Sequence, residues 1–297
     1  MRAWRAPTDT AAVQQLAARL WPNATHPGGL GWEAASDQLP ARTMLAERHG
    51  AIVGWAGVNG TDITVQGASR DTDGASLLLD WALDIVGDHQ ATAVAFVGDD
   101  AFRTLLSRAG FVEDASRTVG GMFRAAAPES AGLPPGYRIR GTRIDETAAR
   151  VAVHRAAWHP ASLPWPDGTD YTIDQNLTSR FTADHLAHVR RAELYESELD
   201  LVVESPDGTL VACCTVWLDT DSGCAEIEPL GVAPEHRRLG LASALCREAG
   251  TRVALRGGTR IFVNTAPNDD YPAPPLTYLA MGFTVVVRAH TFTRPAS

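Results

Sequence analysis

The sequence predicts a mixed α/β (α+β) fold of two similar domains, each with a mixed, mostly antiparallel sheet flanked by helices. Its 297 residues suit two domains of ordinary size. A stretch rich in Ala, Pro and Gly, residues 124–136, lacks apolar periodicity and divides the chain. The patterns on its two sides repeat in the same order, which indicates an internal duplication. We therefore expect domains at residues 1–125 and 137–297, joined by a linker at 126–136.

Each half is expected to follow the order strand, helix, hairpin, strand, helix, strand, helix, strand. Strands that alternate with helices imply a mixed sheet with helices on both faces. The matched points are Trp4-Arg5 and Ile139-Arg140 for the first strand, residues 50–57 and 207–214 for the hairpin, and residues 105–111 and 278–283 for the helix that runs into Gly-Phe.

Composition excludes several classes of protein. A formal net charge of −9 argues against a general nucleic-acid binder, whose affinity depends on neutralising phosphates. No apolar run approaches the roughly 20 residues of a membrane span. The first residues lead into a polar stretch, so we expect no secretory signal and a cytoplasmic protein. All 26 basic residues are arginine.

The four cysteines, Cys213, Cys214, Cys224 and Cys246, match no zinc pattern. Adjacent Cys213 and Cys214 are poorly placed to bridge each other. We expect four buried, reduced thiols and no metal site.

The most informative segment is residues 224–246, which reads as a strand (224–232), a sharp loop (233–238) and a helix from about residue 239. Pro229 cannot donate to a sheet ladder, so a bulge there would splay the strand from its neighbour. The loop presents free backbone N–H groups at the positive end of the helix, which is an anion site. Gly240 lets a phosphate approach the main chain.

This segment resembles the acetyl-CoA signature of the GNAT superfamily of N-acetyltransferases, Gln/Arg-x-x-Gly-x-Gly/Ala. Arg237, Gly240 and Ala242 occupy its fixed positions, and a Tyr-x-x-x-Gly-Phe sequence follows at residues 278–283. The resemblance covers residues 137–297 well and residues 1–125 only in outline. It implies two GNAT-like domains, each with a sheet split into a V, and acetyl-CoA in the cleft between the central strands.

The resemblance also implies the cofactor contacts. The amides from Arg238 to Ser243 would bind the CoA pyrophosphate, and the strand at 230–232 would pair with the pantetheine amides. The Val232 N–H would polarise the thioester carbonyl. The full predicted set is Leu230, Gly231, Val232, Arg237, Arg238, Leu239, Gly240, Leu241, Ala242, Ser243, Asn264 and Asn268.

The two asparagines are alternatives for one contact. The family carries an Asn about seven residues before its tyrosine, and that position is Tyr271 here. The prolines nearby predict that the last helix starts late, near Pro275.

Transfer to an amine needs a neutral amine and a protonated leaving thiolate. By the resemblance, Tyr278 is the candidate general acid. Glu226 and Glu228 are two residues apart on a strand, so they share a face. Each carboxylate would raise the pKa of the other towards neutral pH, where a general base works best. The alternative is that both only dock the amine as a cation while water carries the proton. His236 is a third candidate base.

The acceptor is expected near residues 158–200, where the second copy is longer than the first. The predicted substrate-binding residues there are Trp158, Trp165, Tyr171, Tyr195 and Glu196. Aromatic rings with scattered acids suit a cationic, partly apolar amine. The alternative is a packed helical cover for the sheet.

The first copy is expected to be non-catalytic. Residues 57–87 contain no Arg-x-x-Gly-x-Ala, and Asp71 and Asp73 stand where an anion should dock. Leu106 takes the tyrosine position. This copy would serve as scaffold, acceptor wall or dimer surface; the alternative is ligand binding without catalysis.

The predicted function is transfer of an acetyl group from acetyl-CoA to a primary amine of a small molecule, by direct attack in a ternary complex. One alternative is a non-catalytic acyl-CoA-binding sensor or assembly protein. Another is a protein or peptide amine acetyltransferase. The sequence leaves a homodimer open.

Overall fold

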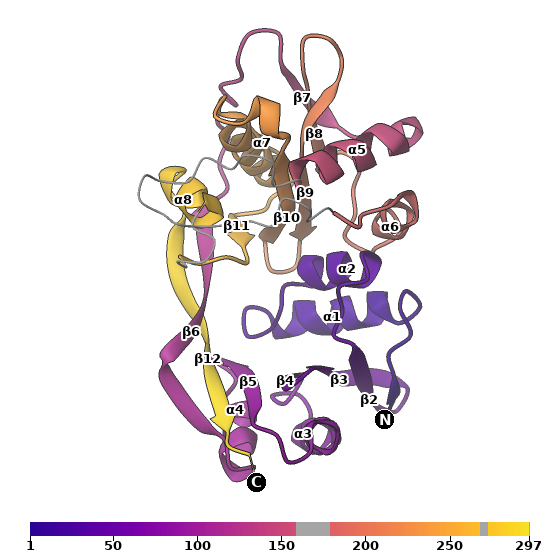
Figure 1. Cartoon of the computed structure of the whole chain (residues 1–297), viewed down its shortest axis with the longest axis vertical. Helices are drawn as coiled ribbons and strands as arrows, with labels where there is room; N and C mark the ends of the chain where they lie inside the picture. Colours follow the sequence, from indigo (N-terminus) through magenta and orange to yellow (C-terminus); the bar gives the residue numbers. More distant parts are fainter. Residues whose placement is uncertain (159–178, 268–272, 297) are drawn as a thin grey trace. The chain divides into compact units, whose positions relative to one another are not determined.

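The computed structural model describes residues 1–158, 179–267 and 273–296. The chain divides into two compact units (Figure 1). The first comprises Met1–Gly121 with Val286–Ser297, and the second comprises Met122–Val285.

The first unit is a sheet in which neighbouring strands are mostly antiparallel. Its strand order is β1-β2-β3-β4-β5-β12-β6, and β4 and β5 form the parallel pair. The elements are β1 (Arg2–Ala3), α1 (Thr10–Leu20), α2 (Pro27–Ala35), β2 (Arg42–Arg48), β3 (Ala51–Asn59), β4 (Asp62–Gln66), α3 (Thr72–Val86), β5 (Ala91–Phe96), α4 (Asp100–Arg108), β6 (Val112–Ala125) and β12 (Thr284–Arg294).

The second unit has the same plan, with strand order β6-β11-β10-β9-β8-β7 and one parallel pair, β10 with β11. Its elements are β7 (Arg138–Gly141), the 3₁₀ turn η1 (Ile144–Glu146), α5 (Thr147–Ala157), α6 (Ala183–Val189), β8 (Asp200–Glu204), β9 (Leu210–Asp219), β10 (Cys224–Val232), the 3₁₀ turn η2 (Pro234–His236), α7 (Leu241–Leu255), β11 (Arg260–Val263) and α8 (Ala273–Ala280).

The predicted fold class is confirmed, and the two units repeat one order of helices and strands. The first strand was placed two residues too late, because β1 is Arg2–Ala3 and not Trp4-Arg5. The Asp9 carboxylate accepts the Arg5 N–H at 2.8 Å and an Arg2 guanidinium N–H at 2.9 Å, so the chain turns there. Trp4 is buried in the core instead.

The final residues of the last strand in each sequence half lie in the sheet of the other unit. In the first unit, residues 289–294 of β12 pair with β5. In the second unit, residues 122–125 of β6 pair with β11. Each sheet therefore contains one strand from the distant half of the sequence.

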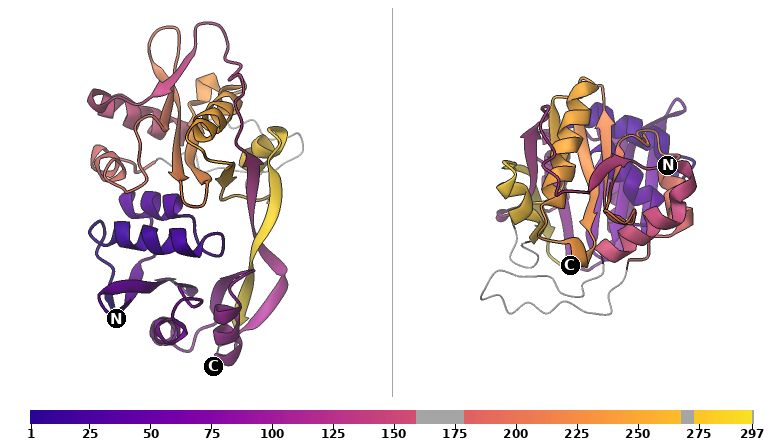
Figure 2. Two further views of the ribbon diagram at one scale, coloured as in Figure 1. Left: turned by 180° about the vertical axis from the view of Figure 1, so that it is seen from behind. Right: turned by 90° about the horizontal axis from the view of Figure 1, so that it is seen from above.

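Helices cover both faces of the second unit's central strands (Figures 1 and 2). On one face, alternate residues of β9 such as Cys214 and Val216 pack with α7 in the main core. On the other face, Cys213 packs against Val153 of α5. All four cysteines are buried thiols outside any disulfide, as predicted.

The predicted linker has no regular secondary structure, and it packs along α7. The Glu129 N–H donates to Thr251 Oγ1 at 3.0 Å, and Arg247 Nη1 donates to the Ala131 carbonyl at 3.1 Å. Leu133 packs against the main core of this unit. The stretch is thus part of the second unit, while the boundaries 125/126 and 136/137 stay predictions.

The Arg288 side chain of β12 forms hydrogen bonds with the loop between α1 and α2 in the first unit. Its Nη2 donates to the carbonyls of Pro22 at 2.9 Å and Ala24 at 2.6 Å. Its guanidinium lies 4.3 Å from the Trp21 ring centroid and 5.0 Å from that of Phe96. The side chain is buried, so these contacts are shielded from water.

Arg288→Ala is expected to lower the free energy of unfolding of the first unit by about 3 kcal/mol, because it removes charge-assisted hydrogen bonds and two cation–π contacts. Urea denaturation followed by tryptophan fluorescence measures the change. Arg294→Ala, on the same strand and partly exposed, is the matched control. Equal midpoints for the two variants would contradict the anchoring role.

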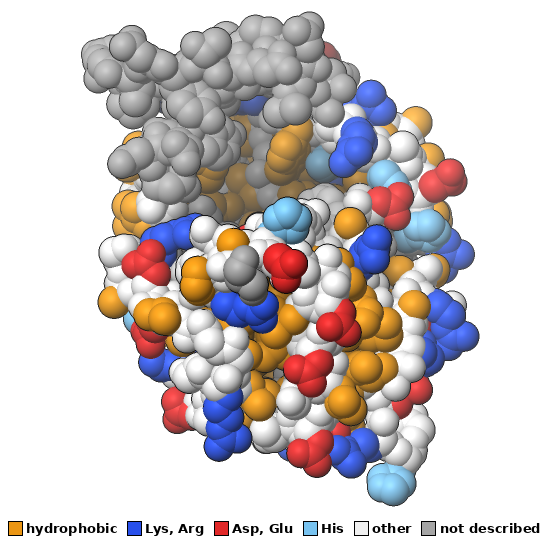
Figure 3. Space-filling view, turned by 60° about the horizontal axis from the view of Figure 1, so that its bottom comes forward, with side chains coloured by type: hydrophobic (Ala, Val, Ile, Leu, Met, Phe, Trp, Pro, Cys, Tyr) orange, Lys and Arg blue, Asp and Glu red, His pale blue; other side chains and the backbone are white. Residues whose placement is uncertain are grey.

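Within the described ranges, no helix combines the length and the apolar character that a membrane span requires. On the face shown in Figure 3, acidic and basic side chains are interspersed with exposed apolar ones and do not gather by sign.

Candidate functional site

Strand β10 has a bulge where the sequence predicted one. Its register with β9 shifts between Ile227 and Leu230, around Pro229. The shift reverses the alternation of side chains. Ala225 and Ile227 before it lie in the same core as Leu230 after it.

Beyond the bulge, β10 leaves its parallel neighbour. The pairing with β11 ends at Glu226 opposite Phe262, whereas the pairing with β9 continues to Val232. The Ala233 N–H donates to Val211 of β9, so the Val232 N–H, one residue earlier, faces the other edge. In the described part of the chain, no strand pairs with residues 227–232 on that edge. Such an edge can add an extended ligand as a further strand.

The loop after β10 ends at an uncapped helix N-terminus. Gly240 is the N-cap of α7 with φ +77°, and no side chain accepts from the first turn. A Cβ on Gly240 would meet nothing within 4 Å, so the space above it is open. The first intrahelical bond runs from the Ala244 N–H to the Gly240 carbonyl. The amides of residues 241–243 therefore have no intrahelical acceptor, as an anion site requires.

The matching helix of the first unit, α3, is capped by its own carboxylate. Asp71 is its N-cap, and its Oδ1 accepts the Gly74 N–H at 3.2 Å. The Arg48 guanidinium holds the same carboxylate and keeps the pKa of Asp71 below its usual value. The Asp71 carboxylate thus already occupies the position that an anionic ligand would take at this helix N-terminus. That arrangement favours the prediction of a non-catalytic first copy, which stays a prediction.

The two predicted carboxylates lie in different surroundings. Glu226 is 1% exposed and stands opposite Trp217 of β9. Glu228 is half-buried, and its carbonyl accepts the Trp217 Nε1–H at 2.6 Å. Glu228 is therefore the more accessible of the two carboxylates. Burial is the main cause of the raised pKa of Tyr278, and the charge of Glu228 is the smallest of the causes.

Tyr278 lies in α8, buried in the main core of the second unit. Its ring centroid is 5.3 Å from that of Phe283. Burial, with smaller effects from Cys246, Cys214 and Glu228, raises its pKa well above the usual value. The phenol stays protonated at neutral pH, which is the form that a general acid needs. The helix begins at Ala273, two residues before the predicted start.

The Arg237 guanidinium donates hydrogen bonds to two backbone carbonyls. Its Nε donates to Val232 at the end of β10 at 3.2 Å, and its Nη2 donates to Ala157 at the end of α5 at 3.0 Å. Next to it, Arg238 is exposed and has φ +64°. Leu239 is also exposed. Asn264 follows β11 and is exposed, whereas Asn268 lies outside the described residues.

Of the predicted acceptor residues, Trp158 is the one that the structure places against β10. A Cβ at Gly231 would overlap the Trp158 ring, so the indole lies directly over that backbone. The ring is also 4.3 Å from that of His154, which stacks on Phe181 at 4.4 Å. Trp158 is 39% exposed, so part of the ring faces outward. Trp165 and Tyr171 lie outside the described residues.

Tyr195 and Glu196 have partners within the protein. The Tyr195 hydroxyl donates to Asp200 Oδ2 at 3.2 Å, and burial raises the pKa of Tyr195 to about 12. Glu196 forms an ion pair with Arg256 at 3.0 Å. Their roles towards an acceptor stay predictions.

The sequence reasoning missed a buried ionic network beneath α5. Arg150 Nε and Nη2 donate to Asp200 Oδ1 at 3.0 and 2.9 Å, and Thr215 Oγ1 donates to the same oxygen at 3.0 Å. Both charged side chains are almost completely inaccessible, at 1% and 0%. The signal available in the sequence was the acidic Asp200 directly before the apolar run Leu-Val-Val.

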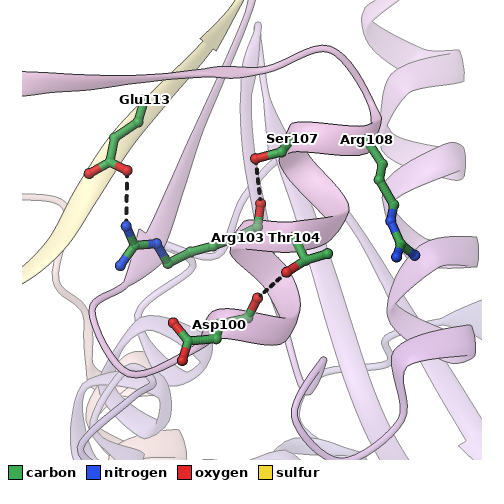
Figure 4. Close-up of a pocket in the computed structure, with 6 residues that line it drawn as sticks. All are labelled: Asp100, Arg103, Thr104, Ser107, Arg108 and Glu113. Atoms are coloured by element: carbon green, nitrogen blue, oxygen red, sulfur yellow. Dashed lines mark hydrogen bonds and ion pairs between the residues drawn. The ribbon is translucent and has the colours of Figure 1, made fainter.

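A shallow pocket on the first unit contains none of the predicted residues. It lies beside α4 and is lined by Asp100, Arg103, Thr104, Ser107, Arg108 and Glu113 (Figure 4). Arg103 pairs with Glu113 at 3.0 Å, and the hydroxyls of Thr104 and Ser107 donate to carbonyls one turn back in the helix (Figure 4). These contacts are ordinary helix and surface interactions.

Comparisons with known proteins agree with this geometry. The model of the Acetyltransferase (GNAT) family matches residues 151–283, which include the bulge, the uncapped turn and Tyr278. No curated protein matches the sequence.

Several solved structures share the fold over nearly the whole chain. A GCN5-related N-acetyltransferase from Sphaerobacter thermophilus is 20% identical with a TM-score of 0.51, covering 100% of this chain and 96% of that one. A tandem GNAT protein from the clavulanic acid biosynthesis pathway, solved without AcCoA, is 16% identical with a TM-score of 0.52, covering 100% and 98%. An acetyltransferase of the GNAT family from Colwellia psychrerythraea is 13% identical with a TM-score of 0.57, covering 99% and 98%. Residues 151–283 thus match the Acetyltransferase (GNAT) family, and the three solved structures share the fold of the chain.

Proposed function

We propose that the protein transfers an acetyl group from acetyl-CoA to a primary amine of a small molecule. The GNAT domain supports acyl-CoA-dependent acyl transfer in general. The observation that carries the finer proposal is the uncapped N-terminus of α7 at Gly240, directly after the open edge of β10. It offers unpaired amide donors for a diphosphate next to an extended backbone for an amide-bearing chain.

The donor set fits acetyl-CoA. The amides of residues 241–243 and the exposed Arg238 would hold the phosphates, and Leu230 and Val232 would bond the pantetheine amides. Leu239 and Asn264 are exposed and free to contact the rest of the cofactor. When bound, acetyl-CoA supplies an activated thioester. The Val232 N–H faces the open edge, where it stabilises the negative charge that develops on the thioester oxygen.

Tyr278 and Glu228 form the acid–base pair of the proposal. The Tyr278 phenol, which is protonated at neutral pH, gives its proton to the leaving thiolate. Glu228 takes the proton of the attacking amine directly or through a water. Glu226 lies on the same strand but is 1% exposed, so Glu228 is the carboxylate that an acceptor amine would reach.

The attack on the thioester is direct, without an enzyme thioester as relay. Cys213, Cys214 and Cys246 are fully buried, and burial raises the pKa of the Cys246 thiol to about 12. A neutral thiol is a poor nucleophile. The partly exposed indole of Trp158 forms an apolar, cation-binding wall for the acceptor.

Thiol release from acetyl-CoA tests the proposal, with phenethylamine, tryptamine, putrescine and spermidine as acceptors. Amine-dependent release is expected. Tight binding of acetyl-CoA without release on any amine or peptide would favour the sensor or assembly protein. Release with peptides and none of the small amines would favour a protein acetyltransferase.

Tyr278→Phe is expected to lower turnover by about 100-fold or more, because a general acid contributes factors of this order. The acetyl-CoA dissociation constant should change little, since the phenol acts on the leaving thiolate. Steady-state rates and calorimetry measure the two quantities.

The matched control is Tyr137→Phe, which removes a hydroxyl bonded to His236 Nδ1 at 3.0 Å in the same unit. Equal turnover of wild type and Tyr278→Phe would leave Tyr278 a structural residue.

A further inference from the structure

Arg237 connects the ends of two elements that are distant in the sequence. Ala157 is the last residue of α5 and Val232 the last residue of β10, and each carbonyl accepts a bond from the same guanidinium. The last carbonyls of a helix accept no hydrogen bond from within the helix. A cation near them is also favoured by the helix dipole. One side chain thus provides hydrogen bonds to the terminal carbonyls of both α5 and β10.

The geometry suits arginine in particular. The guanidinium is a planar fork with donors on different nitrogens, so Nε and Nη2 can point to two carbonyls at once. A lysine ammonium is a single point charge on a flexible stem. A lysine at position 237 would bind one of the two carbonyls and would not fix the distance between Ala157 and Val232.

Gly231 completes the connection from the strand side. A Cβ at this position would overlap Trp158 and lie 2.6 Å from the Ala157 Cβ. The end of α5 therefore lies against bare backbone of β10, one residue before Val232. The guanidinium contact and the backbone contact hold the same two segments together.

We propose that Arg237 is a positioning residue, which sets the distance between the acceptor wall at Trp158 and the Val232 amide. This inference rests on the proposed function of both groups. It gives the side chain a role other than binding phosphate, because two of its nitrogens already donate to the protein. Reacting groups must be placed within fractions of an ångström, and a displacement of about 1 Å can cost about 100-fold in rate.

The test compares Arg237→Ala with Arg238→Ala as the matched control. Arg237→Ala is expected to lower kcat/KM for the fastest amine of the panel by about 10- to 100-fold, with the acetyl-CoA Kd within about threefold of wild type. Arg238→Ala is expected to weaken acetyl-CoA binding several-fold and to leave the KM of the amine unchanged. Arg237→Lys should regain only part of the lost kcat/KM.

A second measurement does not depend on activity. In the free protein, hydrogen exchange of the amides of residues 154–158 should become faster in Arg237→Ala and stay unchanged in Arg238→Ala. Unchanged exchange there, or a tenfold loss of acetyl-CoA affinity with a normal KM for the amine, would overturn the positioning role. Failure of the wild-type protein to acetylate any amine would instead overturn the proposed function, while the exchange result would still stand.

Discussion

Gly240→Glu is expected to abolish measurable acetyl-CoA binding. The new carboxylate would stand at the helix end where the diphosphate should bind, and it would cap the free amides as Asp71 caps those of α3. A side chain at φ +77° adds strain of about 1–3 kcal/mol. The strain lowers the stability of the free and the bound protein alike, so the loss of affinity comes from the charge. Repulsion between the new carboxylate and a phosphate about 4 Å away is on the order of 4 kcal/mol, which is a loss of more than about 100-fold in affinity. Isothermal calorimetry measures it.

Gly257→Glu is the control for strain. Gly257 follows α7 at the other end of the helix with φ +82°, and a Cβ there also meets nothing within 4 Å. The two substitutions therefore carry the same backbone cost and differ in which helix end receives the charge. Unchanged affinity in Gly240→Glu, or an equal loss in both variants, would remove the cofactor assignment from this turn.

Asp200→Asn is expected to destabilise the second unit by about 3–5 kcal/mol, because it leaves the buried Arg150 guanidinium without its countercharge. The change should appear in urea unfolding followed by hydrogen exchange of β8 and β9. Replacing both residues, Arg150→Met with Asp200→Leu, should recover most of the loss, since no uncompensated charge is then buried.

An exposed pair supplies the comparison. Glu198 pairs with Arg252 at 3.2 Å, but its side chain is 68% exposed. Glu198→Gln should therefore change the stability by no more than about 0.5 kcal/mol. A similar small effect for Asp200→Asn would show that the Arg150 charge finds another partner.

The sequence was informative wherever local chemistry determines the backbone. Pro229 predicted the bulge, the observed strand Cys224–Val232 has the predicted bounds, and helix α7 begins at Leu241, two residues after its predicted start. The mixed sheets with helices on both faces follow in the same way from alternating strand and helix patterns, whereas their mostly antiparallel pairing is what the resemblance implies.

Features that depend on distant contacts could not be predicted. Glu226 is buried and Glu228 is half-buried, and this difference depends on which distant elements pack against β10. The Arg237 contacts join residues 80 positions apart. The partner of a terminal strand is equally non-local, so nothing in β6 or β12 indicates which sheet it completes.

The exchanged last strands have a consequence for synthesis on the ribosome. The first unit's core includes Phe292, and its sheet needs residues 289–294. A nascent chain that has delivered only residues 1–121 therefore presents an unfinished sheet edge and an incomplete core. The second unit, residues 122–285, has all its strands before these residues emerge. The later-made unit is thus able to mature first, and the earlier-made one waits exposed to chaperones and aggregation until its final strand arrives.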